Sequence, residues 1–324
     1  MYLVMRYLNG FSSAEEGTLR FTALDFSGDN IIVAGQVLYL RDIRYFVESI
    51  IVEIREIFQV QLFFGLDIFD VNWSPGVVDE QPRNRSVDYS CFRDPTNSFY
   101  SHRFDLLQAI LTHPSLRGRF HLVSQGRIVW KAGPCFAYMA ICHEVEMRLF
   151  CGTQTSVGEP GRGTELASHL IGNVRGGTLR NLFVMFQYLC MMGTFNKTSH
   201  SKECDVTMMR VPHPEIGRLW MLYLTFIRPT IATWQSYFSG HKAAARARNN
   251  LFFGPYRPVT SQELSRNLSR HTQRLLRNKI SISLWRHIAT WFLNYNSVKF
   301  REYHTLLNRS ALAVQSGHGC VICW

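Results

Sequence analysis

The sequence has few charged residues, and it lacks both a signal peptide and an apolar run long enough to span a membrane. Of its 324 residues, 18% are charged and 46% are hydrophobic, a composition that excludes a disordered chain. Residues 1–13 lack the basic region, apolar stretch and cleavage site of a secretory signal. The most apolar window, residues 219–238, is interrupted by Arg228 and Pro229, which favours a buried helix ending before Pro229. We therefore expect a sizeable core and no membrane partner.

Motifs for metal binding and for nucleotide hydrolysis are also missing from the sequence. The eight cysteines follow no repeating spacing, and Cys320 and Cys323 have no second pair at zinc-site spacing. No glycine loop of the Walker A type occurs, which excludes an ATP-driven motor within this chain. The motifs G-x-S-x-G and H-E-x-x-H are absent as well, which excludes the hydrolases that depend on them. We expect the protein to lie in a reducing compartment, the nucleus. We also expect it to bind no metal and no cofactor.

Acidic residues are scarce in one stretch near the C-terminus. Residues 241–309 contain thirteen Lys and Arg against two Asp and Glu, whereas residues 1–160 contain fourteen against eighteen. A charge so concentrated attracts polyanions, of which nucleic acid is the commonest. Arginines spaced by four and three residues lie on one face of a helix predicted over 261–277, where they can follow a DNA backbone. The predicted DNA contacts are Arg266, Arg270, Arg274, Arg277 and Lys279. The alternative is a solvated basic face.

A stretch rich in glycine and polar residues separates two parts of the sequence that differ in their apolar pattern. We expect residues 1–151 to form a helical domain, residues 152–163 a linker, and residues 164–324 a mixed domain with a small antiparallel sheet. The apolar pattern predicts helices over 42–66, 101–112, 134–149, 215–227, 261–277 and 282–295. Apolar and aromatic runs predict paired strands over 182–195 and 204–211. The expected fold class is therefore α+β, and mainly α.

Four pieces of the second part occur in an order that resembles one family. Residues 158–166 read Gly-Glu-Pro-Gly-Arg-Gly-Thr-Glu-Leu, and a hairpin follows with Lys197 near its tip and Lys202 as a second choice. Residues 284–290, Leu-Trp-Arg-His-Ile-Ala-Thr, begin a helix, and residues 316–319 read Ser-Gly-His-Gly. This arrangement resembles the catalytic domain of tyrosine recombinases, the phage-integrase-type enzymes of DNA strand exchange. It is most similar to recombinase-like regions of fungal mobile elements and of the RecQ-helicase-like proteins associated with them.

The resemblance implies a role for each of these residues in phosphodiester cleavage without a metal. Arg162 and Arg286 would hold the non-bridging phosphate oxygens, because guanidinium groups stay charged and bind bidentately. Lys197 would protonate the departing 5′-oxygen. His318 would donate to the phosphate or act as acid or base. Glu165 would brace the site from behind.

Two features of the sequence depart from the family pattern. The position three before Arg286, where the family usually has a His, holds Ser283, which carries no charge. The family's nucleophilic tyrosine follows the Gly-His motif, but no tyrosine follows His318 in this sequence. Tyr295 and Tyr303 precede that motif, so neither is a match for the nucleophile.

The sequence therefore predicts a DNA-binding, tyrosine-recombinase-like protein that is truncated and inactive in strand exchange. Its expected partners are duplex DNA and other copies of the chain on that DNA. One alternative is a non-catalytic DNA-binding region derived from a RecQ-helicase-like polypeptide. Another is an unrelated helical protein with a basic surface that faces RNA or a membrane.

Overall fold

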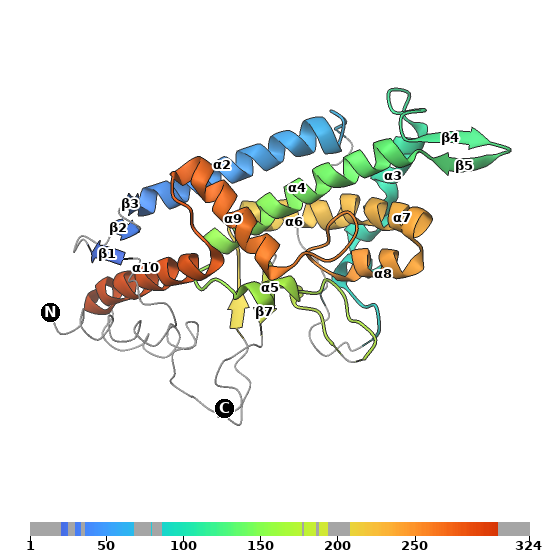
Figure 1. Ribbon diagram of the computed structural model, residues 1–324. Helices are drawn as coiled ribbons and strands as arrows, with labels where there is room; N and C mark the ends of the chain where they lie inside the picture. The colour runs from blue at the N-terminus through green and yellow to red at the C-terminus, as the bar shows by residue number, and fades with distance from the viewer. Residues whose placement is uncertain are drawn as a thin grey trace.

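Figure 1 shows the computed structural model of the protein, in which long helices lie lengthwise beside one another. The structure describes residues 21–24, 30–33, 36–67, 79, 86–176, 178–185, 188–193 and 208–303, with the backbone alone for 21–24, 33, 36 and 294–303. The α-helices are α2 (Leu40–Ile57), α3 (Asp105–Thr112), α4 (Ala132–Ser156), α5 (Gly163–Ala167), α6 (Pro214–Leu222), α7 (Arg228–Ser239), α8 (His241–Asn249), α9 (Ser261–Leu276) and α10 (Ile282–Tyr303). Tighter or wider helical turns are η1 (Phe58–Leu62), η2 (Cys91–Arg93), η3 (Ser98–Phe104) and η5 (Tyr223–Ile227).

The core is centred on α4, which packs against α2, α6, α7 and α9. α2 is amphipathic, and its buried residues Ile43, Phe46, Ile50 and Ile54 recur at intervals of three and four. α4 has no such polar face, because helices cover it on several sides. One hydrophobic cluster joins residues from α2 through to α10. This cluster therefore includes residues from both sides of the linker predicted over 152–163.

The segment predicted as a linker begins inside a helix. α4 continues to Ser156, past the expected end at Leu149, and Gly152 packs so closely on Ile216 that an added Cβ would lie 2.5 Å from its Cδ1 atom. Thr153 is buried and accepts a hydrogen bond of 2.9 Å from the indole Nε1 of Trp220. Polar residues that indicated a loop are thus core residues whose hydrogen bonds are satisfied inside the protein.

In the described part of the chain, three small antiparallel sheets accompany the helices, which confirms the α+β, mainly α class. The strands are β1 (Phe21–Leu24), β2 (Asn30–Val33), β3 (Gln36–Tyr39), β4 (His121–Ser124), β5 (Arg127–Trp130), β6 (Leu182–Met185), β7 (Tyr188–Gly193) and β8 (Met208–Arg210). The single strand predicted over 182–195 is wrong, because the chain turns and pairs Met185 with Tyr188. β7 then pairs with β8, in agreement with the predicted pairing of the strands over 182–195 and 204–211.

The helix expected to end before Pro229 instead continues. A π-helical turn, η5, joins α6 to α7, and Pro229 falls in the first turn of α7. Proline is tolerated there because the first turn of a helix needs no intrahelical N–H donor. α7 then meets α8 in an antiparallel pair at the end of the molecule opposite α10.

Candidate functional site

The starts of α5, α9 and α10 meet around an open hollow of about 360 Å³. Figure 1 shows these three helices converging near the middle of the molecule. The hollow is lined by Arg162, Gly163, Thr164, Ser261, Gln262, Ser265, Ile282, Ser283 and Arg286. The structure thus brings together the two arginines that the sequence singled out, and it places Ser283 beside them. Hydrogen-bond donors at the starts of three helices therefore line the same hollow.

Arg162 is held at the start of α5 by the backbone of the helix itself. Its conformation is extended, its N–H donates to Glu165 Oε2 at 3.3 Å, and its carbonyl accepts from Leu166 at 2.9 Å. Gly163 lies against α9, where an added Cβ would come within 3.2 Å of the Ser261 Cβ atom. This close approach brings the α9 hydroxyl groups to the edge of the hollow.

The loop before Arg162 is fixed through three successive carbonyl groups. The carbonyl of Glu159 accepts from Arg210 Nε at 2.7 Å, and that of Pro160 accepts from Arg286 Nε at 3.2 Å. The carbonyl of Gly161 accepts from Gln154 Nε2 at 3.0 Å. These donors come from β8, α10 and α4, so side chains replace the regular hydrogen bonds that the loop lacks. The glycine-rich segment is therefore a fixed support for Arg162.

Behind the loop, Glu165 and Arg210 form an ion pair in the interior. Arg210 Nη1 lies 2.5 Å from Glu165 Oε1, and Nη2 lies 3.4 Å from Oε2. Both side chains are about 95% buried, with exposed fractions of 6% and 5%. Gly193, at the end of β7, makes room for the pair, because an added Cβ would lie 1.8 Å from Glu165 Oε1. Glu165 was expected to support the site from behind, and in the structure it is buried against Arg210, a residue that the sequence analysis did not single out.

The charges around the hollow influence one another. Burial lowers the pKa of Arg286, and the neighbouring Arg162 lowers it further, so the two guanidinium groups lie close enough to repel. Burial raises the pKa of Glu159, whose Oε2 is buried without a hydrogen-bond partner among the described residues. An anion placed between the arginines would relieve their repulsion.

The remaining predicted catalytic residues are placed less completely. Lys197 and His318 lie outside the described residues. Tyr295 and Tyr303 belong to the part of α10 whose side chains are not described. Among the described residues, no tyrosine lines the hollow.

The arginines of α9 divide into two groups. Arg270 donates to Glu144 at 3.0 Å, and Arg274 donates to Glu53 at 2.6 Å, so these two bind α9 to α4 and α2. Arg148 joins the network through both glutamates, at 3.2 Å each. Arg266 on α9, and Arg277 and Lys279 just after it, are exposed as well, but they make no ion pair with a described residue. The expected DNA-contacting row is thus in part a set of ion pairs between helices.

The supporting residues Arg210, Gln154 and Gly193 were not found by sequence reasoning. Arg210 did carry a signal, since it is a charged residue at the end of the apolar run that became β8. A charge in such a run indicates a buried partner. Gln154 and Gly193 carry no signal, because their roles depend on contacts with residues distant in the sequence.

Comparisons of the chain with protein-family models, curated proteins and solved structures find no match. Within the described residues, no helix has the length and apolarity needed to cross a membrane. The same part of the chain contains no group of three or more histidine, cysteine or acidic side chains placed to hold a metal ion.

Proposed function

We propose that the protein binds duplex DNA through its phosphate backbone, with Arg162 and Arg286 as a clamp on one phosphate. The observation that carries the proposal is that these two arginines, far apart in the sequence, line one hollow. Two guanidinium groups directed at one space suit a phosphodiester, because each can donate two parallel hydrogen bonds to its oxygens. The same pair belongs to two of the four pieces on which the resemblance to tyrosine recombinases rests.

The surroundings of the arginines favour an anion over a cation. None of the described residues that line the hollow is acidic, and Thr164, Ser261 and Ser283 add hydroxyl donors. Two carboxylates lie behind the hollow: Glu165 is paired with Arg210, and Glu159 interacts with Arg286. Phosphate contacts of this kind supply affinity without reading sequence. The proposed activity is therefore binding to the DNA backbone by a protein of recombinase ancestry.

Binding rather than cleavage is proposed because no tyrosine hydroxyl is present among the described residues that line the hollow. A covalent phosphotyrosyl intermediate needs a tyrosine in line with the phosphate, and no described residue of the hollow is a tyrosine. Charge stabilisation and positioning remain without that group.

The test is a titration of a fluorescent duplex followed by anisotropy, at several salt concentrations. The variant R162Q/R286Q should bind about a hundredfold more weakly, and its plot of log affinity against log salt should be shallower by about two. The matched control is R127Q/R175Q, which removes two exposed arginines outside the hollow. Circular dichroism establishes that each variant is folded.

Equal loss of affinity in both double variants would mean that binding follows net charge alone and would overturn the clamp. Wild-type protein that does not bind duplex DNA at low salt would overturn the proposed function itself. The variant R286K separates charge from geometry, since lysine keeps the charge but not the bidentate fork. It should bind more weakly than wild type.

A further inference from the structure

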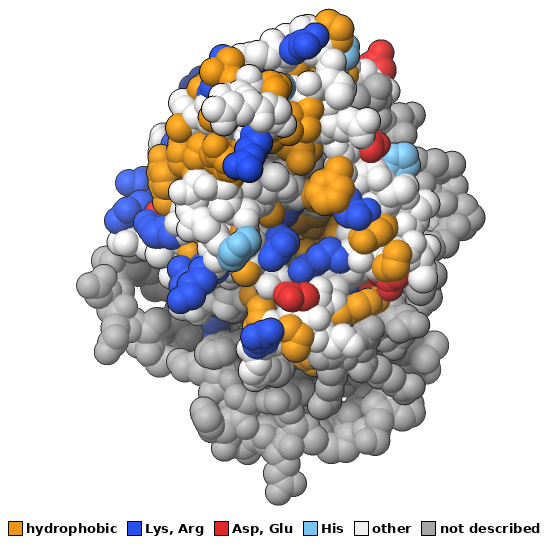
Figure 2. All heavy atoms as spheres, turned by 90° about the vertical axis from the view of Figure 1, so that its right-hand side faces the viewer, with side chains coloured by type: hydrophobic (Ala, Val, Ile, Leu, Met, Phe, Trp, Pro, Cys, Tyr) orange, Lys and Arg blue, Asp and Glu red, His pale blue; other side chains and the backbone are white. Residues whose placement is uncertain are grey.

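A second cavity, of about 490 Å³, lies at the end of the molecule where η2, η3, α7 and α8 meet. Its lining residues are Phe92, Arg93, Tyr100, Arg103, Phe104, Ile171, Leu224, Arg228, Pro229, Ala232, Thr233, Ser236 and Arg248. Figure 2 views this end and shows Lys and Arg side chains gathered around a hollow near the centre of the face. The volume is typical of cavities that take small molecules.

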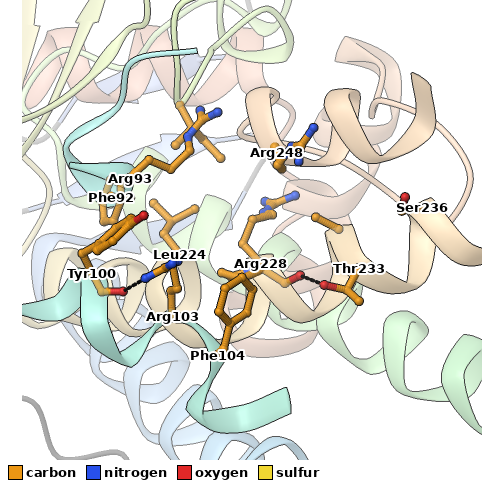
Figure 3. Close-up of a pocket in the computed structure, with 13 residues that line it drawn as sticks. Phe92, Arg93, Tyr100, Arg103, Phe104, Leu224, Arg228, Thr233, Ser236 and Arg248 are labelled. Atoms are coloured by element: carbon orange, nitrogen blue, oxygen red, sulfur yellow. Dashed lines mark hydrogen bonds between the residues drawn. The ribbon is translucent and has the colours of Figure 1, made fainter. Parts of the chain in front are cut away.

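Four arginines from four different elements surround this space, and none of the thirteen described lining residues is acidic. Figure 3 shows Arg93 from η2, Arg103 from η3, Arg228 from α7 and Arg248 from α8 around the same cavity. Arg248 is exposed and makes no ion pair or hydrogen bond with a described residue. Arg228 and Arg93 are paired with Glu146 and Asp88 behind the lining, at 2.8 Å and 3.9 Å, so the carboxylates compensate part of the positive charge from outside the cavity.

Arg228 is anchored at the back of the cavity. It is 3% exposed, and its Nη2 donates to Glu146 at 2.8 Å and to the carbonyl of Leu251 at 2.6 Å. Its Nε is buried and has no hydrogen-bond partner in the described part of the chain. A buried donor without a partner is rare in native proteins and calls for an acceptor. This residue is therefore held in place with one donor unused.

Arg93 is positioned from the other side. Its Nη2 donates to Asn249 Oδ1 at 2.8 Å, and it packs on Gly172 so closely that an added Cβ would lie 1.9 Å from the same nitrogen. Burial and, to a smaller extent, the charge of Arg248 lower the pKa of Arg93 to about 10, and Asp88 opposes this shift. The guanidinium stays charged at neutral pH and is close enough to Arg248 to repel it.

One wall of the cavity is aromatic. The Arg103 guanidinium lies 3.6 Å from the centroid of the Tyr100 ring and 4.7 Å from that of Phe104. Phe104 is 45% exposed, which is unusual for a phenylalanine and leaves a ring face open beside the cationic groups. Aromatic side chains beside arginines stack nucleobases, because every base has a π face. Thr233 and Ser236 add hydroxyl groups to the opposite wall.

We infer that this cavity binds a nucleoside phosphate, with the phosphate among Arg93, Arg228 and Arg248 and the base against Phe104. Phosphate is favoured over carboxylate because several guanidinium groups converge on one space, and a phosphate has enough oxygens to accept from all of them, whereas a carboxylate has two. The source is either a free mononucleotide or a nucleotide at the 5′ end of a single strand. This inference is independent of the clamp at Arg162 and Arg286.

The test is calorimetric titration of the full-length chain with ADP and, separately, with pyrophosphate. R248Q should weaken ADP binding by about tenfold, the usual effect of removing one charged hydrogen-bond donor. The matched control is R246Q, because Arg246 is exposed on the same helix but does not line the cavity. F104A should weaken the binding of ADP and leave that of pyrophosphate unchanged. Y45A, which removes an exposed ring on α2, should change neither.

Three results would overturn the inference. They are the absence of saturable ADP binding, an equal effect of R246Q and R248Q, and an F104A variant that binds ADP as wild type does. Competition with a 5′-phosphorylated hexathymidylate identifies the source of the nucleotide. If the strand displaces ADP, the cavity accepts the 5′ end of a single strand. If it does not, the ligand is a free mononucleotide. R162Q/R286Q should keep ADP binding and R248Q should keep duplex binding, so failure of one proposal is distinguishable from failure of the other.

Discussion

Glu165 and Arg210 are joined by two contacts in the interior, directly behind the loop that presents Arg162. Arg210 also donates to the carbonyl of Glu159 in that loop, and Glu165 accepts from the backbone N–H of Arg162. The pair therefore connects β8, α5 and the loop at once. Its loss would change the position of Arg162 as well as the stability of the core.

Breaking this pair from one side should be strongly destabilising. E165A leaves the Arg210 guanidinium buried without its carboxylate, and such changes cost about 3–5 kcal/mol. The double variant E165L/R210M replaces both charges with apolar groups and should recover more than half of that loss. Urea denaturation followed by circular dichroism measures both values. A double variant as unstable as E165A would contradict the reading of the pair as a charge-compensated unit.

Adding one methyl group at Gly193 should disturb the same pair. The Cβ atom of G193A would lie 1.8 Å from Glu165 Oε1 and 2.7 Å from Arg210 Nη1, so the carboxylate must move. We expect a lower melting temperature and a severalfold weaker affinity for duplex DNA. The control is G133A in the first turn of α4, where nothing lies within 4 Å of an added Cβ. Unchanged melting and binding in G193A would contradict the expected crowding.

Stability should fall in acid partly through His271. Burial, together with the neighbouring charges of Arg148, Arg270 and Arg274, lowers the pKa of His271 to about 3. Arg274 Nη2 lies 3.4 Å from His271 Nδ1, and the buried Nε2 atom has no hydrogen-bond partner among the residues that the structure describes. Between the ordinary histidine pKa and this lowered value, the unfolded chain binds a proton that the folded chain does not. The free energy of unfolding therefore decreases as pH falls, by up to about 1.4 kcal/mol per unit.

The measurement compares wild type with H271N in urea at pH 7, 5 and 4. The variant should lose less stability than wild type over this range, because asparagine takes up no proton. Parallel loss in the two proteins would show that His271 does not contribute.

The two groups of arginines on α9 should separate experimentally. R270E/R274E places negative charge against Glu144 and Glu53 and should cost about 1–2 kcal/mol, since exposed pairs are weak but repulsion is added. R266E/R277E breaks no ion pair among the described residues and should lower DNA affinity with little change in stability. Melting curves measure the stability of both variants, and fluorescence anisotropy measures their affinity for duplex DNA. Equal affinity of wild type and R266E/R277E would mean that these residues form a solvated face.

No covalent complex with DNA should form. A nicked suicide substrate incubated with the protein should leave no chain attached to DNA after denaturation, because no described residue of the hollow is a tyrosine. An adduct that disappears when Tyr295 or Tyr303 is replaced by phenylalanine would restore strand exchange as the function.

The fold class could be predicted from the sequence because apolar spacing reports directly on buried helix faces. Ile43, Phe46, Ile50 and Ile54 show this in α2. The end of α4 could not be predicted, since Gly152 and Thr153 have loop composition and become helical only through packing against α6. Local composition indicates exposure, and tertiary contacts overrode it here.

The candidate site could be predicted in part. The segment around Arg162 and the helix start at Arg286 were indicated by their motifs, and the structure places both at one hollow. Arg210 and Gln154 were missed, because a hydrogen bond to a distant carbonyl leaves no pattern in neighbouring residues. The ion pairs of Arg270 and Arg274 were missed for the same reason, and their regular spacing indicated an open basic row instead.

The carbonyl groups of residues 159–161 are held by Arg210, Arg286 and Gln154, which belong to three separate elements. A fragment cut at the predicted domain start, residue 164, would lose Arg162 together with the whole loop. A fragment cut at residue 158 would keep the loop but lose Gln154. Either cut would therefore remove Arg162 or a side chain that holds its loop, and an inactive fragment would say nothing about the activity of the whole.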